Sequence, residues 1–185
     1  MVFSKVGFDM NFNDYRFLLI ISALAVFLLL LFSIPFRKKN YSNKAGKNLV
    51  KTSENKKYLM NYLSIIFAAF LIAILFFRNL GFVYNLIICL VALLAVYMGT
   101  EEIVLNGLSG LYENALIGNG KYLSLSEIFV LPVLSYSKEE QAALDQRILV
   151  ITTEKKGSVN FIFSSEDEKN FVENQLLKLK PELCR

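Results

Sequence analysis

Three long runs of apolar residues without a charge precede Gly99 and decide what this chain can fold into. They extend from Phe17 to Pro35, from Tyr58 to Phe77 and from Leu80 to Met98. A helix rises about 1.5 Å per residue, so each run reaches about 28 Å, close to the roughly 30 Å hydrocarbon core of a bilayer. A chain of 185 residues could hardly hide three such helices from water. The runs therefore predict three membrane-spanning helices.

The first run has a second interpretation, a cleaved signal peptide. It is long for the apolar part of such a peptide, and no small-x-small cleavage motif follows it. Arg37, Lys38 and Lys39 come directly after it and are typical of the flank of a retained span. We therefore expect the first run to stay in the mature protein.

Lysine and arginine are concentrated between the first and second runs. The segment 37–57 has a single acid, Glu54, among many basic residues, whereas the turn between the second and third runs has only Arg78. The positive-inside rule then predicts a cytoplasmic loop at 37–57, an N-terminus outside and a cytoplasmic segment after Gly99. Abundant Lys, Asn, Phe and Ile hint at an AT-rich bacterial genome, so we expect a multi-pass protein of the bacterial inner membrane.

The basic segment allows two interpretations. It can serve only as a topology signal, or it can also contact anionic lipid, which attracts each nearby basic residue by about 1 kcal/mol. A basic pair at the tip of the last expected hairpin could join such a contact, although plain solvation also explains it. The candidate lipid contacts are Arg37, Lys38, Lys39, Lys44, Lys47, Lys51, Lys56, Lys57, Lys155 and Lys156.

The spans themselves offer little to a transported substrate. Transporters place ionisable or ion-coordinating groups inside the membrane, and these runs contain no charged residue. Asn61 and Asn85 are the largest polar side chains apart from the tyrosines, and each is more typical of a helix–helix hydrogen bond than of a transport site. A channel or carrier subunit is therefore the least favoured function. Small residues such as Ala92 and Ala95 leave close helix packing or a homo-oligomer open.

After Thr100 the pattern changes to short alternating segments separated by turn residues. Asn119-Gly120 is the strongest hairpin signal, and Gly157 lies in the loop of a second expected hairpin. The expected strands are 102–106, 110–117, 121–125, 128–136, 147–153 and 158–163, with Pro132 bending the fourth.

An amphipathic helix is expected to close the chain. Ser165 and Glu168 form a capping box, and Pro181 ends the helix. The expected apolar face consists of Phe171, Val172, Leu176 and Leu179. The sequence thus predicts a three-span anchor, 1–100, followed by a small β-rich α+β domain, 101–185, in which one curled antiparallel sheet is plugged by the helix.

The strands from Gly110-Leu111-Tyr112-Glu113-Asn114 to Leu123-Ser124-Leu125-Ser126-Glu127-Ile128 resemble a pattern in small bacterial membrane proteins of uncharacterised function. In those proteins, membrane spans precede a pleckstrin-homology-like (PH-like) domain. The resemblance covers about 101–179, and this chain departs from the pattern at Ala115, where glycine is common, and at Leu125, where tryptophan is common. The resemblance implies a PH-like fold and a non-catalytic role.

The residue types argue against catalysis. The chain has no histidine, no cysteine pair at zinc spacing and no phosphate-cradling glycine loop, so we expect neither an enzyme nor a bound metal or cofactor. Its acid pairs, Glu101-Glu102 and Glu139-Glu140, have ordinary structural explanations, as does the acidic start of the last helix. The basic residues lie near the spans rather than among aromatics of the domain, which disfavours nucleic acid.

Two functional hypotheses follow. The first is a non-enzymatic membrane protein whose PH-like domain binds a protein partner at the inner leaflet, as an accessory, regulatory or immunity-type protein. The alternative is a sensor of anionic lipid.

Overall fold

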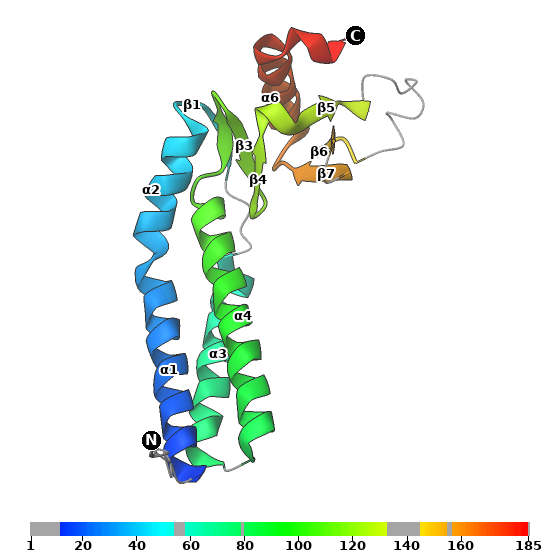
Figure 1. The fold of residues 1–185 in the computed structure, drawn as a ribbon. Coiled ribbons are helices and arrows are strands. Elements are labelled where there is room, and N and C mark those ends of the chain that lie inside the picture. Colours follow the sequence, from blue (N-terminus) through cyan, green and yellow to red (C-terminus); the bar gives the residue numbers. More distant parts are fainter. Residues whose placement is uncertain (1–11, 54–57, 79, 133–144, 155–156, 185) are drawn as a thin grey trace, which may run out of the picture. The chain divides into compact units, whose positions relative to one another are not determined.

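The structure is a computed structural model that describes residues 12–53, 58–78, 80–132, 145–154 and 157–184. The chain divides into two compact units. The helical unit comprises residues up to 32 together with 62–100, and the mixed unit comprises 33–61 and 101–185. Figure 1 shows the elements of both units, which are described separately below.

The helical unit consists of α1 (Phe12–Phe32), most of α3 (Tyr58–Phe77) and most of α4 (Phe82–Asn106). All three helices are long and apolar enough to cross a membrane. Three small side chains, Ala23, Ala68 and Ala92, are buried between the helices, which lets the backbones approach closely. Large apolar side chains such as Phe70 and Leu94 point outward, as expected for surfaces that face lipid.

Helix α4 does not stop at the predicted end of the third span. It continues to Asn106, so the strand expected at 102–106 is wrong. Val104 and Leu105 are buried on one side of this extension, and the Gly107 amide donates to the Ile103 carbonyl where the helix ends. The short apolar alternation in 102–106 fits one buried helix face as well as it fits a strand.

The mixed unit contains two antiparallel sheets rather than the one curled sheet expected. The first has the order β1 (Asn48–Lys51), β2 (Gly110–Tyr112), β3 (Ala115–Gly118) and β4 (Lys121–Ser124). A 3₁₀ turn, η1 (Leu125–Glu127), leads to the second sheet, whose order is β5 (Ile128–Val130), β6 (Ile148–Thr153) and β7 (Gly157–Ile162). Part of the strand expected at 128–136 lies outside the described residues.

Both predicted hairpins are confirmed. Asn119 and Gly120 have φ values of 53° and 69°, the positive pair that a tight type I′ turn between β3 and β4 requires. Strands β6 and β7 pair from Ile148 with Ile162 to Thr153 with Gly157.

The segment 37–57, expected as a loop, contains a helix and a strand. Helix α2 (Ile34–Ala45) begins just after α1, and β1 pairs with β2 at the edge of the first sheet. The backbones come so close here that a Cβ on Gly110 would lie 2.6 Å from the Val50 carbonyl oxygen. The range 101–185 therefore lacks one strand of its own sheet and the helix that precedes that strand.

The central strands of the first sheet, β2 and β3, are buried on both faces. Leu111, Leu116 and Leu123 contribute to a core shared with β5–β7 and the C-terminal helix. Side chains on the other face, including Tyr112 and Ile117, pack with Ala45 of α2 and with Val104 and Leu105 of α4. This double burial explains why β2 and β3 lack the polar alternation of a half-exposed strand.

The closing helix, α6 (Glu166–Leu179), is confirmed, and a 3₁₀ turn, η3 (Pro181–Cys184), follows it. Val172 and Leu176 are fully buried in the main core. Phe171 and Leu179, expected on the same face, are exposed instead, Phe171 by 53%. The buried stripe is therefore narrower than predicted, and Leu183 of η3 extends it.

Ser165 and Glu168 form a modified capping box at the start of α6. The Ser165 hydroxyl accepts from the Glu168 amide at 3.2 Å, as predicted. The Glu168 carboxylate, however, accepts from the amide and hydroxyl of Ser164 at 3.0 and 2.7 Å. It also accepts from the amide and hydroxyl of Ser53, which follows β1. Glu168 thus ties the end of β1 to α6.

These bonds predict a pH dependence. Partial burial pushes the pKa of Glu168 up, but the hydrogen bonds from Ser164 and Ser53 outweigh it and lower the pKa below its ordinary value of 4.5. The ionised carboxylate then stabilises the fold above pH 4.5, and this stabilisation is lost as the pH falls through the lowered pKa. We expect Glu168→Gln to reduce the free energy of unfolding at pH 7 by about 1–3 kcal/mol.

Denaturant unfolding of the detergent-solubilised protein at pH 7 and pH 3.5 measures this effect. Asp167→Asn removes a charge from the same helical turn and is the control. The Glu168→Gln deficit should shrink at pH 3.5, and an equal deficit at both pH values would contradict the assignment.

Candidate functional site

A charged cluster joins α2 to the end of α4 within the mixed unit. The Glu101 carboxylate pairs with the Arg37 guanidinium and accepts a hydrogen bond from the Tyr41 hydroxyl. Arg37 and Glu101 are mostly buried, with 20% and 21% of their side chains exposed. The ring of Tyr41 also packs on Tyr122 of β4, with 5.5 Å between the ring centroids. The cluster orients α2 and thereby the lysines on it.

Most of the predicted basic residues that the structure describes come together on α2 and β1. Lys38, Lys39 and Lys44 lie on α2, Lys47 precedes β1, and Lys51 ends it; all five are exposed. We call these five residues the basic surface. Arg37 instead forms an ion pair with Glu101. Lys56, Lys57, Lys155 and Lys156 lie outside the described residues.

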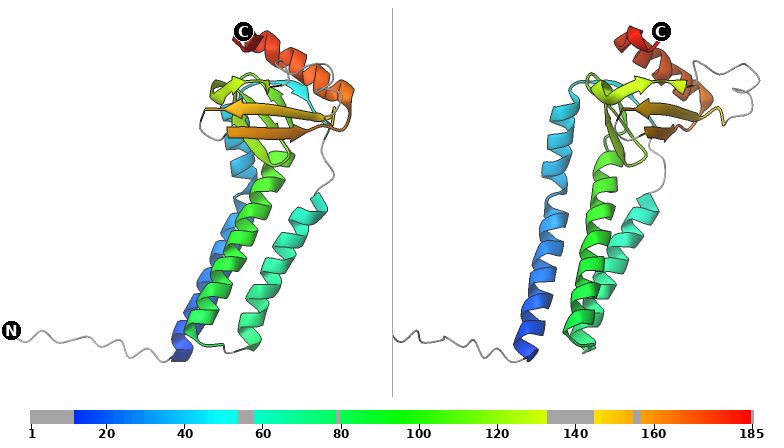
Figure 2. Two further views of the ribbon diagram at one scale, coloured as in Figure 1. Left: turned by 90° about the vertical axis from the view of Figure 1, so that its right-hand side faces the viewer. Right: turned by 45° about the vertical axis from the view of Figure 1, so that its right-hand side comes forward.

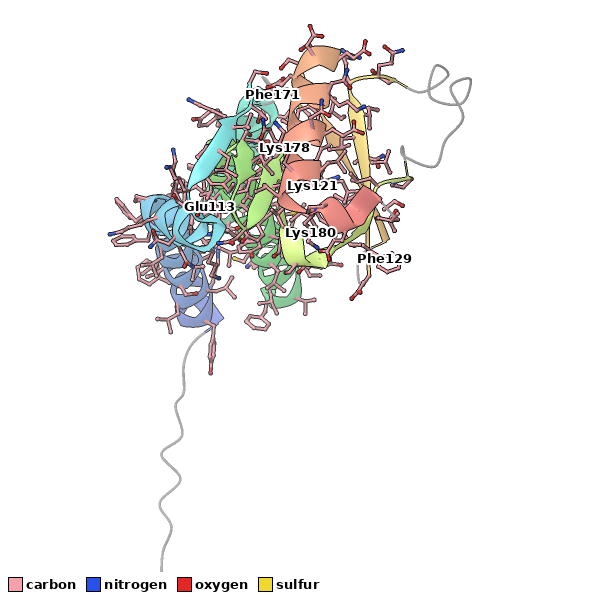
Figure 3. The ribbon with its side chains drawn as sticks, turned by 90° about the horizontal axis from the view of Figure 1, so that it is seen from above. Glu113, Lys121, Phe129, Phe171, Lys178 and Lys180 are labelled. Atoms are coloured by element: carbon pink, nitrogen blue, oxygen red, sulfur yellow. The ribbon has the colours of Figure 1, made fainter. Side chains whose placement is uncertain are left out.

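Two features of the basic surface reduce what it can bind. Glu113 follows β2, and its carboxylate accepts from the Lys47 amide at 3.1 Å, which puts a negative charge beside the lysines (Figure 3). Strand β1 is also an edge strand, where lysines commonly prevent pairing with another chain. Lys47 and Lys51 thus have a structural role that needs no ligand.

A second surface is the outer face of the sheet β5–β7. Leu149, Ile151 and Phe161 point into the core, so the opposite side chains of these strands point outward. Among the outward side chains are Phe129, which is 65% exposed, and Ile162, which is 40% exposed. We call this the apolar face; it consists of Phe129, Val130, Ile148, Val150 and Ile162.

No described helix covers the apolar face. In the left view of Figure 2, strands β6 and β7 lie at the front of the mixed unit, and α6 lies along another side of it. Figure 3 likewise shows Phe129 and Phe171 on different parts of the unit. The sequence contains a signal for this surface. Ile148 and Val150 alternate with Leu149 and Ile151, so both faces of β6 are apolar and one of them lies outside the core.

A hollow of about 300 Å³ lies where the edge strands β4 and β7 approach each other. It is lined by Lys121, Tyr122, Leu123, Ser158 and Val159. The Lys121 ammonium donates to the Asn160 carbonyl at 3.3 Å across this gap. Burial, together with the charges of Glu127 and Tyr41, raises the pKa of Tyr122, so its hydroxyl is neutral at pH 7. These groups do not form an acid–base or nucleophilic set.

The two acidic residues Glu101 and Glu168 each have structural partners within the described residues. Glu101 is paired as above, and Glu168 is held by serines. Among the residues that the structure describes, no three His, Cys, Asp or Glu side chains come close enough to hold a metal ion. Glu139 and Glu140 lie outside the described residues.

Comparison with known proteins gives no match to a family model, to a curated protein or to a solved structure.

The Glu101 cluster can be tested by mutation. Glu101→Ala leaves Arg37 mostly buried without its partner and removes the acceptor of Tyr41, so we expect the free energy of unfolding to fall by about 2–3 kcal/mol. Glu102→Ala, at the exposed neighbouring position, should change it by less than about 0.5 kcal/mol. Denaturant unfolding in detergent measures both variants. Equal effects of the two substitutions would show that the cluster does not stabilise the mixed unit.

Proposed function

We propose that this chain is a non-enzymatic membrane protein that presents a PH-like interaction domain at the inner leaflet of a bacterial membrane. In this proposal the apolar face binds a protein partner, and the chain serves as an accessory, regulatory or immunity-type protein. The observation that carries the proposal is the apolar face itself. It brings five apolar side chains to the outer side of one sheet, and an exposed apolar surface on a folded domain is typical of a protein-binding site.

Three features support a PH-like domain. The strands fall into a four-stranded and a three-stranded antiparallel sheet, which share one core. A C-terminal helix, α6, inserts Val172 and Leu176 into that core. The residues that carry the resemblance, Gly110 to Ile128, provide three consecutive strands and the turn into the second sheet.

The pairing of β1 with β2 supports the proposed topology. These strands precede α3 and follow α4, and partners in one sheet must lie on the same side of a membrane. Helices α3 and α4 then cross as a hairpin. The basic surface belongs to the same unit, so the positive-inside rule favours the cytoplasm for that side and the outside for the N-terminus.

A photo-crosslinking experiment in native membranes tests the protein partner. A photoreactive phenylalanine analogue at Phe129 or Ile162 of the full-length chain should give a discrete protein adduct, because these side chains are exposed on the apolar face. The same analogue at Phe171 is the matched control, since Phe171 is also exposed but lies on α6 (Figure 3). Adducts of similar yield at all three positions, or none at Phe129 and Ile162, would contradict the proposal.

A second candidate function, sensing of anionic lipid, is favoured by one observation. The lysines of the basic surface lie on a helix and a strand of a folded unit, so they can act together as one surface. At about 1 kcal/mol for each lysine near an anionic bilayer, Lys39 and Lys44 alone would contribute about 2 kcal/mol.

Hydrogen exchange of the full-length protein in nanodiscs tests this candidate. We expect amides of 38–51 to exchange more slowly with phosphatidylglycerol present than in phosphatidylcholine alone. The difference should vanish in about 1 M salt, where the Debye length is about 3 Å. Lys39→Gln with Lys44→Gln should reduce it, whereas Lys178→Gln, on α6, should not (Figure 3). Identical exchange in both lipids would rule out lipid sensing by the basic surface.

A further inference from the structure

Arg16 lies in the second turn of α1 and caps α3. Its Nη2 donates to the carbonyls of Leu75 at 2.5 Å, Phe76 at 3.1 Å and Arg78 at 3.1 Å. These carbonyls belong to the last turn of α3 and to Arg78, which follows it. The last carbonyls of a helix have no amide partners within the helix, and the helix dipole attracts a cation there. All three bonds use Nη2, so the two N–H groups of Nη1 make no hydrogen bond to a described residue.

A hollow of about 240 Å³ opens beside this guanidinium. Arg16 forms its cationic wall, and Phe17, Ile20 and Phe76 form its apolar walls. Ile20 is buried, whereas Phe17 and Phe76 are 61% and 51% exposed. The hollow thus has the composition of a site for a molecule with an anionic group and an apolar chain.

Exposed tyrosines place the hollow near the headgroup level of a bilayer. Tyr15 precedes Arg16 on α1, and Tyr84 lies in the first turn of α4; both are exposed. The two helices begin at the same end of the helical unit (Figure 1). Tyrosines with one apolar and one polar end are enriched at the membrane interface, and Ile20 lies one turn deeper on α1 than Arg16.

The described charges at this end are positive. Among the side chains that the structure describes in the helical unit, the charged ones are Arg16 and Arg78. Arg78 is exposed and does not line the hollow. A guanidinium binds phosphate oxygens with strong, charge-assisted hydrogen bonds, and apolar surroundings strengthen these bonds.

We propose that this hollow binds an anionic phospholipid of the bilayer. Nη1 of Arg16 donates to the lipid phosphate, and one acyl chain lies against Phe17, Ile20 and Phe76. The site rests on the three helices crossing a membrane and is independent of the protein-binding and lipid-sensing functions proposed for the mixed unit. The site lies within the helical unit, near the start of α1, whereas the basic surface belongs to the mixed unit.

Native mass spectrometry of the full-length protein tests the site. The protein is reconstituted in nanodiscs of equal phosphatidylglycerol and phosphatidylcholine, released in mild detergent, and its retained lipids are counted. We expect the wild type to retain one phosphatidylglycerol in clear preference to phosphatidylcholine. Arg16→Gln should abolish the preference, and Phe17→Ala should reduce retention several-fold without touching the guanidinium.

Two control variants carry matched changes at the same end of the helical unit. Arg78→Gln removes the other charge, and Phe82→Ala removes an exposed ring that does not line the hollow. Both should retain the wild-type lipid. Equal retention of the two lipids by the wild type would overturn the proposal, as would losses in Arg78→Gln and Phe82→Ala that match those in Arg16→Gln and Phe17→Ala. If Arg16→Gln disturbs the end of α3, Phe17→Ala still tests the site, because it changes a wall of the hollow and leaves the hydrogen bonds of Arg16 in place.

Discussion

The sheet β1–β4 is the part of the mixed unit on which the other elements depend, because its central strands β2 and β3 are buried on both faces. On one face it shares a core with β5–β7 and α6. On the other face it packs against α2 and the last turns of α4, the segments that continue from the first and third apolar helices. A strand that is covered on both sides must be apolar on both sides, and β2 and β3 meet this demand with Leu111, Tyr112, Leu116 and Ile117. The same packing holds Tyr41 near Glu101 and turns the lysines of α2 to the surface.

The parts of this fold that sequence predicts are those set by local physics. The spans follow from runs without charge, the β3–β4 hairpin from Asn119-Gly120, and the start of α6 from Ser165 and Glu168. The sequence does not predict helix α2 and strand β1, because their stability comes from partners far along the chain: Glu101 for Arg37, and Gly110 to Tyr112 for β1. In isolation, 37–57 is a polar, lysine-rich segment with no apolar periodicity.

The candidate surfaces likewise include features that the sequence predicts and features that depend on distant partners. The lysines of the basic surface can be predicted from the sequence, since charge composition is visible without a fold. The ion pair of Arg37 with Glu101 and the position of Glu113 beside Lys47 cannot be predicted in this way. The apolar face needs the sheet to be known, because Phe129 and Ile162 look like ordinary core residues until β5, β6 and β7 are paired. The hollow beside Arg16 combines two helices, so neither helix reveals it alone.

The pairing of β1 with β2 also has a consequence for the order in which the protein is made. A ribosome completes β1 before it begins α3 and completes β2 only after α4. Roughly 60 residues separate the strands, so at about 5–20 residues/s β1 waits about 3–12 s for its partner. During that interval the β1 segment has no β2 to pair with, and lysines such as Lys47 and Lys51 disfavour pairing with another chain. Lysines at this edge thus disfavour pairing with other chains both before β2 is made and in the finished sheet.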